Sequence, residues 1–203
     1  MIIAFFSNYM NPHQKFLSDE ITLQKGVEYY FVSMIEVPEW RQRLGYPNYS
    51  DLPYVINTWK SDTEKKKAGD LAITADVAIF GTVESISYQI IRCKHTDQLS
   101  LEVSERWLKK GILNLLSPRL LRNMWYYHTL FRKKPVYKLC SSAYAAGDQY
   151  KMFSFKDRCY KWGYFTKVEQ MKRDNLGVSL AEYVPRIMWC ARFFKFIHPE
   201  LPI

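Results

Sequence analysis

Short and almost uninterrupted apolar segments alternate along this chain with segments of helical character, and this alternation constrains the fold most. The apolar segments are 2–6, 28–35, 76–81, 135–142 and 159–165. Strands that are apolar on both sides are typical of parallel sheets covered on both faces. Strands that alternate with helices favour an α/β fold. We therefore predict a Rossmann-like three-layer domain with a mainly parallel sheet over residues 1–165.

Residues that begin or end helices mark two of the helical segments. The pair Asn11–Pro12 predicts the start of one helix, and Gly26 predicts its end. Ser61 and Glu64 have the spacing of a capping box, which predicts the start of a second helix. Gly69 is the expected C-terminal end of that helix.

The composition changes near the end of the chain. Residues 166–184 are polar and charged, which predicts an interdomain linker. An apolar run follows Pro185, and the letters HPEL then indicate a helix start. We expect 185–203 to be the first strand and helix of a second, truncated domain.

Composition and cysteine spacing indicate a cytoplasmic globular protein. Hydrophobic residues make up 48% of the chain and charged residues 24%, which is enough to form a packed core. The apolar run at 2–6 is too short for a signal peptide, and no segment reaches the roughly 18 apolar residues of a membrane span. The cysteines are scattered, which favours reduced thiols over a disulfide or metal site. They are Cys93, Cys140, Cys159 and Cys190.

Positive charge is concentrated in one part of the chain. The net charge is +9, and 106–138 holds nine Lys or Arg residues and no Asp or Glu. Such a field attracts phosphate groups on lipids, nucleic acids or ligands. A helix from Pro118 would place Arg119, Arg122 and Lys133 opposite an apolar arc, as in helices at membrane surfaces. A helix packed on the sheet gives the same pattern. No nucleic-acid-binding motif accompanies the charge, so we expect no nucleic-acid partner.

Open α/β sheets bind ligands beyond the carboxyl ends of their strands, so the residues after each strand are candidates for a site. Asn8, Asn11 and His13 follow the first strand. A nearby helix N-terminus would lower the pKa of His13 and keep its imidazole neutral, as a general base requires. Capping and closing the loop is the alternative role of all three residues.

The later strands are followed by glycine, hydroxyl and charged residues. These candidates are Gly81, Glu84, Ser104, Glu105, Arg106, Ser141 and Ser142. Gly81 would let a ligand approach the backbone, and the two serines before a helix would hold a phosphate or a sugar hydroxyl. Helix capping explains the hydroxyl and small residues of 104–111 and 141–149 equally well. No GxGxxG or GxxxxGK[ST] pattern occurs, which disfavours NAD and ATP sites, and we predict no cofactor and no metal.

Several stretches, in this order, resemble the N-terminal half of bacterial glycosyltransferases with the GT-B fold, of the family 1/family 4 type. They are FFSNYMNPHQ, VEYYFVSMIEVPEWRQRLGY, ADVAIFGTVES, SERWLKKG, KLCSSAYAAGDQ and CYKWGYF. The resemblance implies an acceptor-side domain, followed in complete enzymes by a domain that binds the nucleotide-sugar donor. Such enzymes transfer a sugar to a hydroxyl acceptor, here a saccharide or lipid-linked acceptor, without a bound metal.

The resemblance also implies roles for single residues. His13 lies in the loop that supplies a catalytic histidine in inverting members, and the other candidates above would bind the acceptor. Arg192 matches the arginine near the donor diphosphate, but Ile197 stands where a lysine is common. The chain is then expected to be the front half of an enzyme, inactive alone. The alternative is a non-catalytic half-enzyme that binds an acceptor or an anionic membrane surface.

Overall fold

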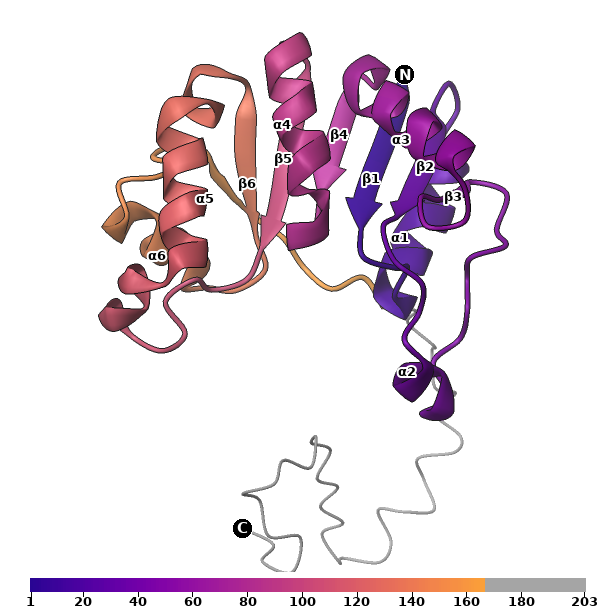
Figure 1. Ribbon diagram of the computed structural model, residues 1–203, viewed down its shortest axis with the longest axis horizontal. Helices are drawn as coiled ribbons and strands as arrows, with labels where there is room; N and C mark the ends of the chain where they lie inside the picture. The colour runs from indigo at the N-terminus through magenta and orange to yellow at the C-terminus, as the bar shows by residue number, and fades with distance from the viewer. Residues whose placement is uncertain (167–203) are drawn as a thin grey trace, which may run out of the picture. The chain divides into compact units, whose positions relative to one another are not determined.

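The computed structural model describes residues 1–166, which form an α/β domain around one seven-stranded sheet (Figure 1). All strands are parallel, in the order β3-β2-β1-β4-β5-β6-β7. The strands are β1 (Ile2–Ser7), β2 (Glu28–Ser33), β3 (Val55–Asn57), β4 (Val77–Phe80), β5 (Leu99–Ser104), β6 (Val136–Cys140) and β7 (Cys159–Lys161). The predicted Rossmann-like fold is confirmed, and β4 lies inside the sheet between β1 and β5.

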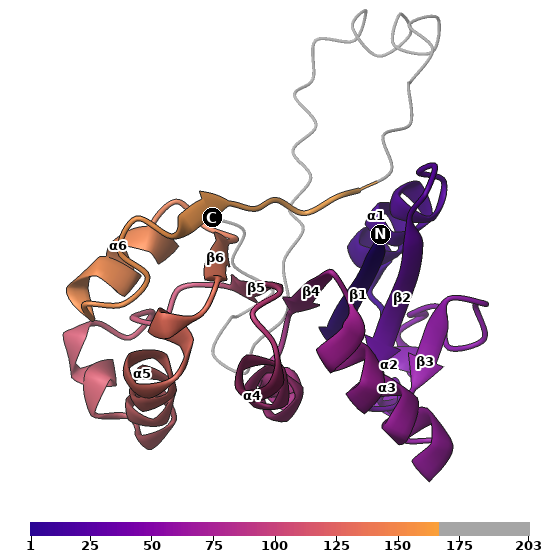
Figure 2. The ribbon, with the colours of Figure 1, turned by 90° about the horizontal axis from the view of Figure 1, so that it is seen from above.

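Helices cover both faces of the sheet. α1 (Pro12–Thr22) lies on one face, and α3 (Asp62–Thr74), α4 (Ile86–His95) and α5 (Pro118–Thr129) lie on the other (Figure 2). The remaining elements are α2 (Glu39–Arg43), α6 (Ala145–Lys151) and the 3₁₀ turns η1 (Val83–Ser85), η2 (Ile112–Leu116) and η3 (Phe131–Lys133). The domain therefore has the three layers expected of this fold class.

Strand β1 shows why the sequence contains continuous apolar runs. Phe6 packs in the cluster that includes Ala72 of α3, whereas Phe5 packs in the cluster that includes Leu17 of α1. Consecutive residues of a strand point to opposite faces, and both faces are covered here. Trp162, which follows β7, packs on the α1 face of the sheet.

Arg92 of α4 joins several elements at the amino ends of the strands. It is fully buried, and burial lowers its pKa to about 10, so it stays charged at neutral pH. It donates hydrogen bonds to Ser100 Oγ (2.9 Å) and to the carbonyls of Ala72 (2.9 Å), Ala75 (2.9 Å), Asp76 (3.3 Å) and Leu99 (2.8 Å). These bonds tie the end of α3 to the starts of β4 and β5.

The two predicted helix starts are confirmed and the two predicted ends are wrong. α1 begins at Pro12, as the pair Asn11–Pro12 predicts, but it ends at Thr22, before Gly26. Ser61 caps α3, because its Oγ accepts a hydrogen bond from the backbone N–H of Glu64 at 3.2 Å. The helix does not end at Gly69 but continues to Thr74. Leu71 and other residues beyond the glycine are buried against the sheet, and this packing outweighs the helix cost of one glycine.

The predictions for the end of the chain are not tested by the structure. The linker at 166–184 lies outside the described residues except for Thr166, and the second-domain segment at 185–203 lies outside them entirely. Among the helices of residues 1–166, none combines the length and the apolarity needed to cross a bilayer.

Candidate functional site

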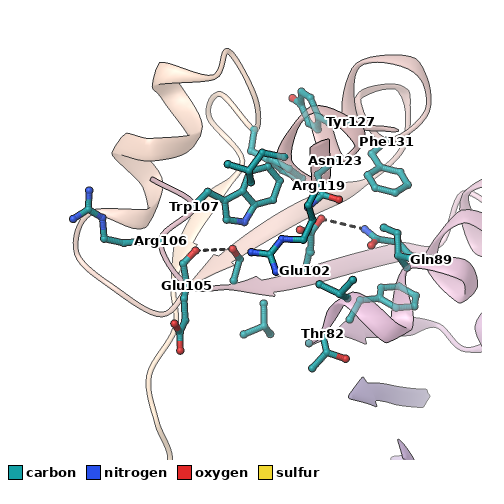
Figure 3. A pocket seen from close by; sticks show the side chains of 18 of the residues that line it. Thr82, Gln89, Glu102, Glu105, Arg106, Trp107, Arg119, Asn123, Tyr127 and Phe131 are labelled. Carbon is teal, nitrogen blue, oxygen red and sulfur yellow. Dashed lines mark hydrogen bonds between the residues drawn. The ribbon is translucent and has the colours of Figure 1, made fainter. Parts of the chain in front are cut away.

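A pocket of about 260 Å³ opens at the carboxyl ends of β4 and β5 (Figure 3). The strand order reverses at β1, because β2 and β3 lie on one side of it and β4 to β7 lie on the other. In open α/β sheets, ligands bind near such a reversal. The polar side chains of the lining include Thr82, Gln89, Glu102, Ser104, Arg119 and Asn123. The aromatic side chains are Phe80, Trp107, Tyr127, Phe131 and Phe155.

Glu102, which lines the pocket, belongs to a buried ion pair. Glu102 of β5 and Lys138 of β6 are partners in the sheet register, and Lys138 Nζ contacts Glu102 Oε1. The Lys138 side chain is 0% exposed and that of Glu102 is 18% exposed. The ammonium group also lies over the rings of Trp107 and Phe155, at 4.1 Å and 4.6 Å from their centroids. These contacts replace the water that the lysine loses on burial.

The second carboxylate oxygen of Glu102 is oriented by α4. Gln89 Nε2 donates a hydrogen bond to Glu102 Oε2 at 3.3 Å, and Figure 3 shows this contact at the centre of the pocket. Each carboxylate oxygen has more than one lone pair, so capacity to accept hydrogen bonds remains. A ligand with hydroxyl groups could therefore donate to a carboxylate that is already fixed in place.

Two side chains at the rim of the pocket, Arg119 and Thr82, have polar groups without a partner among the described residues. Arg119, in the first turn of α5, extends over the pocket and forms no ion pair with any described residue (Figure 3). Thr82 Oγ1 is buried and has no hydrogen-bond partner within residues 1–166. Buried polar groups are normally paired, so the Thr82 hydroxyl is an unusual unpaired group beside the pocket.

Asp148 of α6 holds the loop that forms another wall. Its buried carboxylate accepts hydrogen bonds from Arg106 Nε (3.1 Å), Arg106 Nη2 (3.2 Å) and the backbone N–H of Leu108 (3.1 Å). Burial acts to raise the pKa of Asp148, but the bonds from Arg106 and Leu108 outweigh it and lower the pKa. Trp107, which lies between these two residues, is thereby fixed against the pocket.

Four of the predicted acceptor residues line the pocket: Gly81, Ser104, Glu105 and Arg106. Their side chains take part in local contacts. The guanidinium of Arg106 points away from the pocket toward Asp148, and Ser104 Oγ donates to the carbonyl of Glu105 at 2.8 Å (Figure 3). A Cβ at Gly81 would lie 3.0 Å from Phe5 Cε2, so packing against Phe5 explains this glycine.

The predicted residues of the first loop lie outside the pocket lining. Gln14 Oε1 accepts hydrogen bonds from the backbone N–H (3.0 Å) and Nδ2 (3.1 Å) of Asn11, which fits the alternative role in closing the loop. Asn8 Oδ1 likewise accepts from the backbone N–H of Tyr9 at 2.9 Å.

His13 has a different environment in the same loop. Its ring meets the ring of Tyr164 edge-on at 4.9 Å, and Tyr164 Oη donates to Glu105 Oε1 at 3.2 Å. Partial burial lowers the pKa of His13, so the predicted direction is confirmed, and burial is its cause. His13 is thus connected through Tyr164 to the loop that lines the pocket.

The other predicted residues lie elsewhere. Glu84 is exposed in η1 and does not line the pocket, and the backbone N–H of Ser141 donates to the carbonyl of Ser104 at 3.0 Å. Ser142 Oγ is buried without a partner among the described residues. Arg192 lies outside those residues. Residues 1–166 contain no group of three or more His, Cys, Asp or Glu side chains placed to hold a metal ion.

Sequence reasoning did not identify Glu102, its partner Lys138 or Gln89. Lys138 interrupts the apolar run PVYKLC, and a charge inside a predicted buried strand is the signal that points to it. Glu102 and Gln89 carry no such signal, because only the register of β5 with β6 and the packing of α4 bring them together.

Comparisons of the chain with protein-family models, with curated proteins and with solved structures find no match. The fold and the geometry of the pocket are therefore the basis for a functional proposal. The pocket combines a fixed carboxylate, an amide, an unpaired cation and aromatic walls.

Proposed function

We propose that residues 1–166 are the acceptor-binding part of a glycosyltransferase, which transfers a sugar from a nucleotide-sugar to a hydroxyl acceptor in glycan, polysaccharide or lipid-linked saccharide synthesis. The observation that carries the proposal is the pocket, where Glu102 and Gln89 lie opposite the aromatic wall that includes Trp107. Sugar hydroxyls donate to carboxylates and amides, and the apolar face of a sugar ring packs on aromatic rings.

The size of the pocket supports a small part of a saccharide as the ligand. Its volume of about 260 Å³ falls just below the roughly 300–1,000 Å³ of pockets for drug-sized ligands. One sugar ring fits such a volume, with the rest of the acceptor outside. A carboxylate in the lining and the absence of a glycine-rich phosphate loop disfavour the nucleotide-sugar as the occupant.

We propose that His13 acts as the base. Its lowered pKa keeps the imidazole neutral near pH 7, so a ring nitrogen can accept a proton. In the proposed step the acceptor oxygen attacks the anomeric carbon, its proton passes to His13, and the nucleoside diphosphate leaves. The link through Tyr164 to Glu105 supports this role, because it ties His13 to a pocket loop.

Saturation-transfer NMR with a panel of methyl glycosides tests the pocket. We expect weak binding of at least one glycoside to the chain, and roughly tenfold weaker binding or more after Arg119→Gln, since hydrogen bonds to charged groups contribute about 1.5–3 kcal/mol. Arg122→Gln is the matched control, because both arginines are exposed near the start of α5 and only Arg119 lines the pocket. Equal binding by both variants, or no binding of any glycoside, would refute the site.

The second candidate is peripheral binding to an anionic membrane, with or without catalysis. The observation that favours it is a set of exposed cations that form no ion pair with described residues: Lys110, Arg119, Arg122, Arg132 and Lys133. Each cation near an anionic surface contributes about 1 kcal/mol, and salt screens this attraction. Sedimentation with anionic vesicles, but not with neutral ones, and release by salt are the expected results.

A further inference from the structure

Three aliphatic side chains project into solvent beside the pocket. Ile112, Leu113 and Leu116 of η2 are 68%, 76% and 73% exposed. We refer to these three residues as the apolar tip. They lie between Lys109 and Arg119, both of which line the pocket. Single exposed leucines are common, but three within five residues form a patch that favours an apolar partner.

The apolar tip is held in place by the chain around it. Leu115, in the same turn, points inward and packs with the cluster formed by Leu108 and Leu120. Asn114 Nδ2 donates a hydrogen bond to the backbone carbonyl of Trp107 at 2.5 Å. The turn is thus anchored to the pocket wall, and its outward orientation is a property of the fold.

Cations surround the apolar tip on both sides in the sequence. Lys110 precedes it, and Arg119 and Arg122 follow it in the first turns of α5. All three are exposed, and no Asp or Glu occurs in 106–138. Aliphatic side chains bordered by Lys and Arg match the interface of an anionic bilayer, where acyl chains lie just below negative headgroups.

We propose that the apolar tip inserts into the interface of an anionic lipid bilayer while Lys110, Arg119 and Arg122 contact the headgroups. This deepens the membrane candidate above, because it assigns insertion to η2 and not to the apolar arc of α5. Leu120 and Tyr127 of α5 are buried in the domain and cannot reach a membrane, whereas Leu121 and Trp125 of the same helix are 51% and 61% exposed. The apolar side chains of α5 therefore do not form one exposed face, as those of the tip do. Where the proposed function holds, the tip would also keep the pocket close to a lipid-linked acceptor, since the two are joined by the same loop.

Co-sedimentation of the full 203-residue chain with phosphatidylcholine vesicles, with and without phosphatidylglycerol, tests the insertion. The variant Leu113→Ser removes an exposed aliphatic side chain without changing the charge. We expect about tenfold weaker binding to anionic vesicles, from the burial that one leucine loses. Leu23→Ser is the matched control, because Leu23 is 77% exposed at the end of α1, and its binding should equal that of the unmodified chain.

The outcomes distinguish insertion of the apolar tip from attraction by charge alone. Binding of Leu113→Ser equal to that of the unmodified chain would overturn insertion and leave only attraction by charge. Failure of the unmodified chain to bind anionic vesicles would overturn both. A dimer that is lost in Leu113→Ser, without vesicle binding, would assign the tip to a second copy of the chain. Glycoside binding by Leu113→Ser, measured in parallel, reports on the pocket independently.

Discussion

Replacing Lys138 by methionine would leave Glu102 without its cation. Methionine fills a similar volume between Trp107 and Phe155, so the main effect is the loss of charge. Removing one partner of a buried ion pair costs roughly 3–5 kcal/mol. Glu102 keeps 18% exposure and the hydrogen bond from Gln89, which favours the lower end of this range.

We therefore expect Lys138→Met to lower the free energy of unfolding by about 3 kcal/mol, or the melting temperature by about 6–12 °C for a chain of this length. Glu102→Gln should cost about 2 kcal/mol, because the aromatic rings still stabilise the lysine. Urea denaturation followed by circular dichroism measures both.

The double variant Glu102→Gln/Lys138→Met distinguishes the ion pair from simple packing. With both charges removed, no buried charge is left unpaired. We therefore expect the free energy of unfolding to fall by about 2 kcal/mol, and not by the sum of the two single losses, which is about 5 kcal/mol. Additive losses would refute the reasoning, since they would mean that Glu102 and Lys138 contribute independently.

Three further predictions concern the fold around the site. Arg92→Met should lower stability by about 3 kcal/mol or more in thermal unfolding, because it leaves buried carbonyls without donors; a minor loss would contradict the role of Arg92. The Asp148 carboxylate should stabilise the fold above about pH 4, and this contribution should be lost as the pH falls through its lowered pKa. Asp148→Asn should lack the contribution. If the urea midpoints of the unmodified chain and of Asp148→Asn fall equally between about pH 6 and about pH 3, this role of Asp148 is excluded. Gly81→Ala should cost roughly 1–3 kcal/mol through its clash with Phe5, whereas Gly147→Ala, which has free space in α6, should be neutral or stabilising.

The fold could be predicted because its strands are buried on both faces. Phe5 and Phe6 are adjacent in β1 and pack on opposite sides of the sheet, so continuous apolar runs indicate covered parallel strands. Two strands were not among the predicted apolar segments. β3 (Val55–Asn57) has only three residues at the edge of the sheet, and in β5 (Leu99–Ser104) polar residues alternate with apolar ones. The end of α3 was misplaced, because burial of Leu71 outweighed the local preference of Gly69.

The site could be predicted only in outline. The rule that ligands lie beyond the carboxyl ends of strands led to Gly81 and Ser104, which do line the pocket. The hydrogen bonds of Asn11 and Arg106 depend on partners that the sequence does not reveal, and these partners occupy their side chains. The ion pair of Glu102 with Lys138 depends on register, which sequence alone does not determine.

Chemical-shift mapping tests the central claim, that a saccharide binds in the pocket at β4 and β5, most directly. The ¹⁵N-labelled chain would be titrated with the methyl glycoside that gives the strongest saturation transfer. We predict that the amide shifts concentrate at 81–89, which follows β4 and includes η1 and the start of α4, and at 102–109, which includes the end of β5 and the loop after it. At the same glycoside concentration these shifts should be several-fold smaller in Arg119→Gln. The absence of shifts from 81–89 and 102–109, or shifts of unchanged size in Arg119→Gln, would contradict the account.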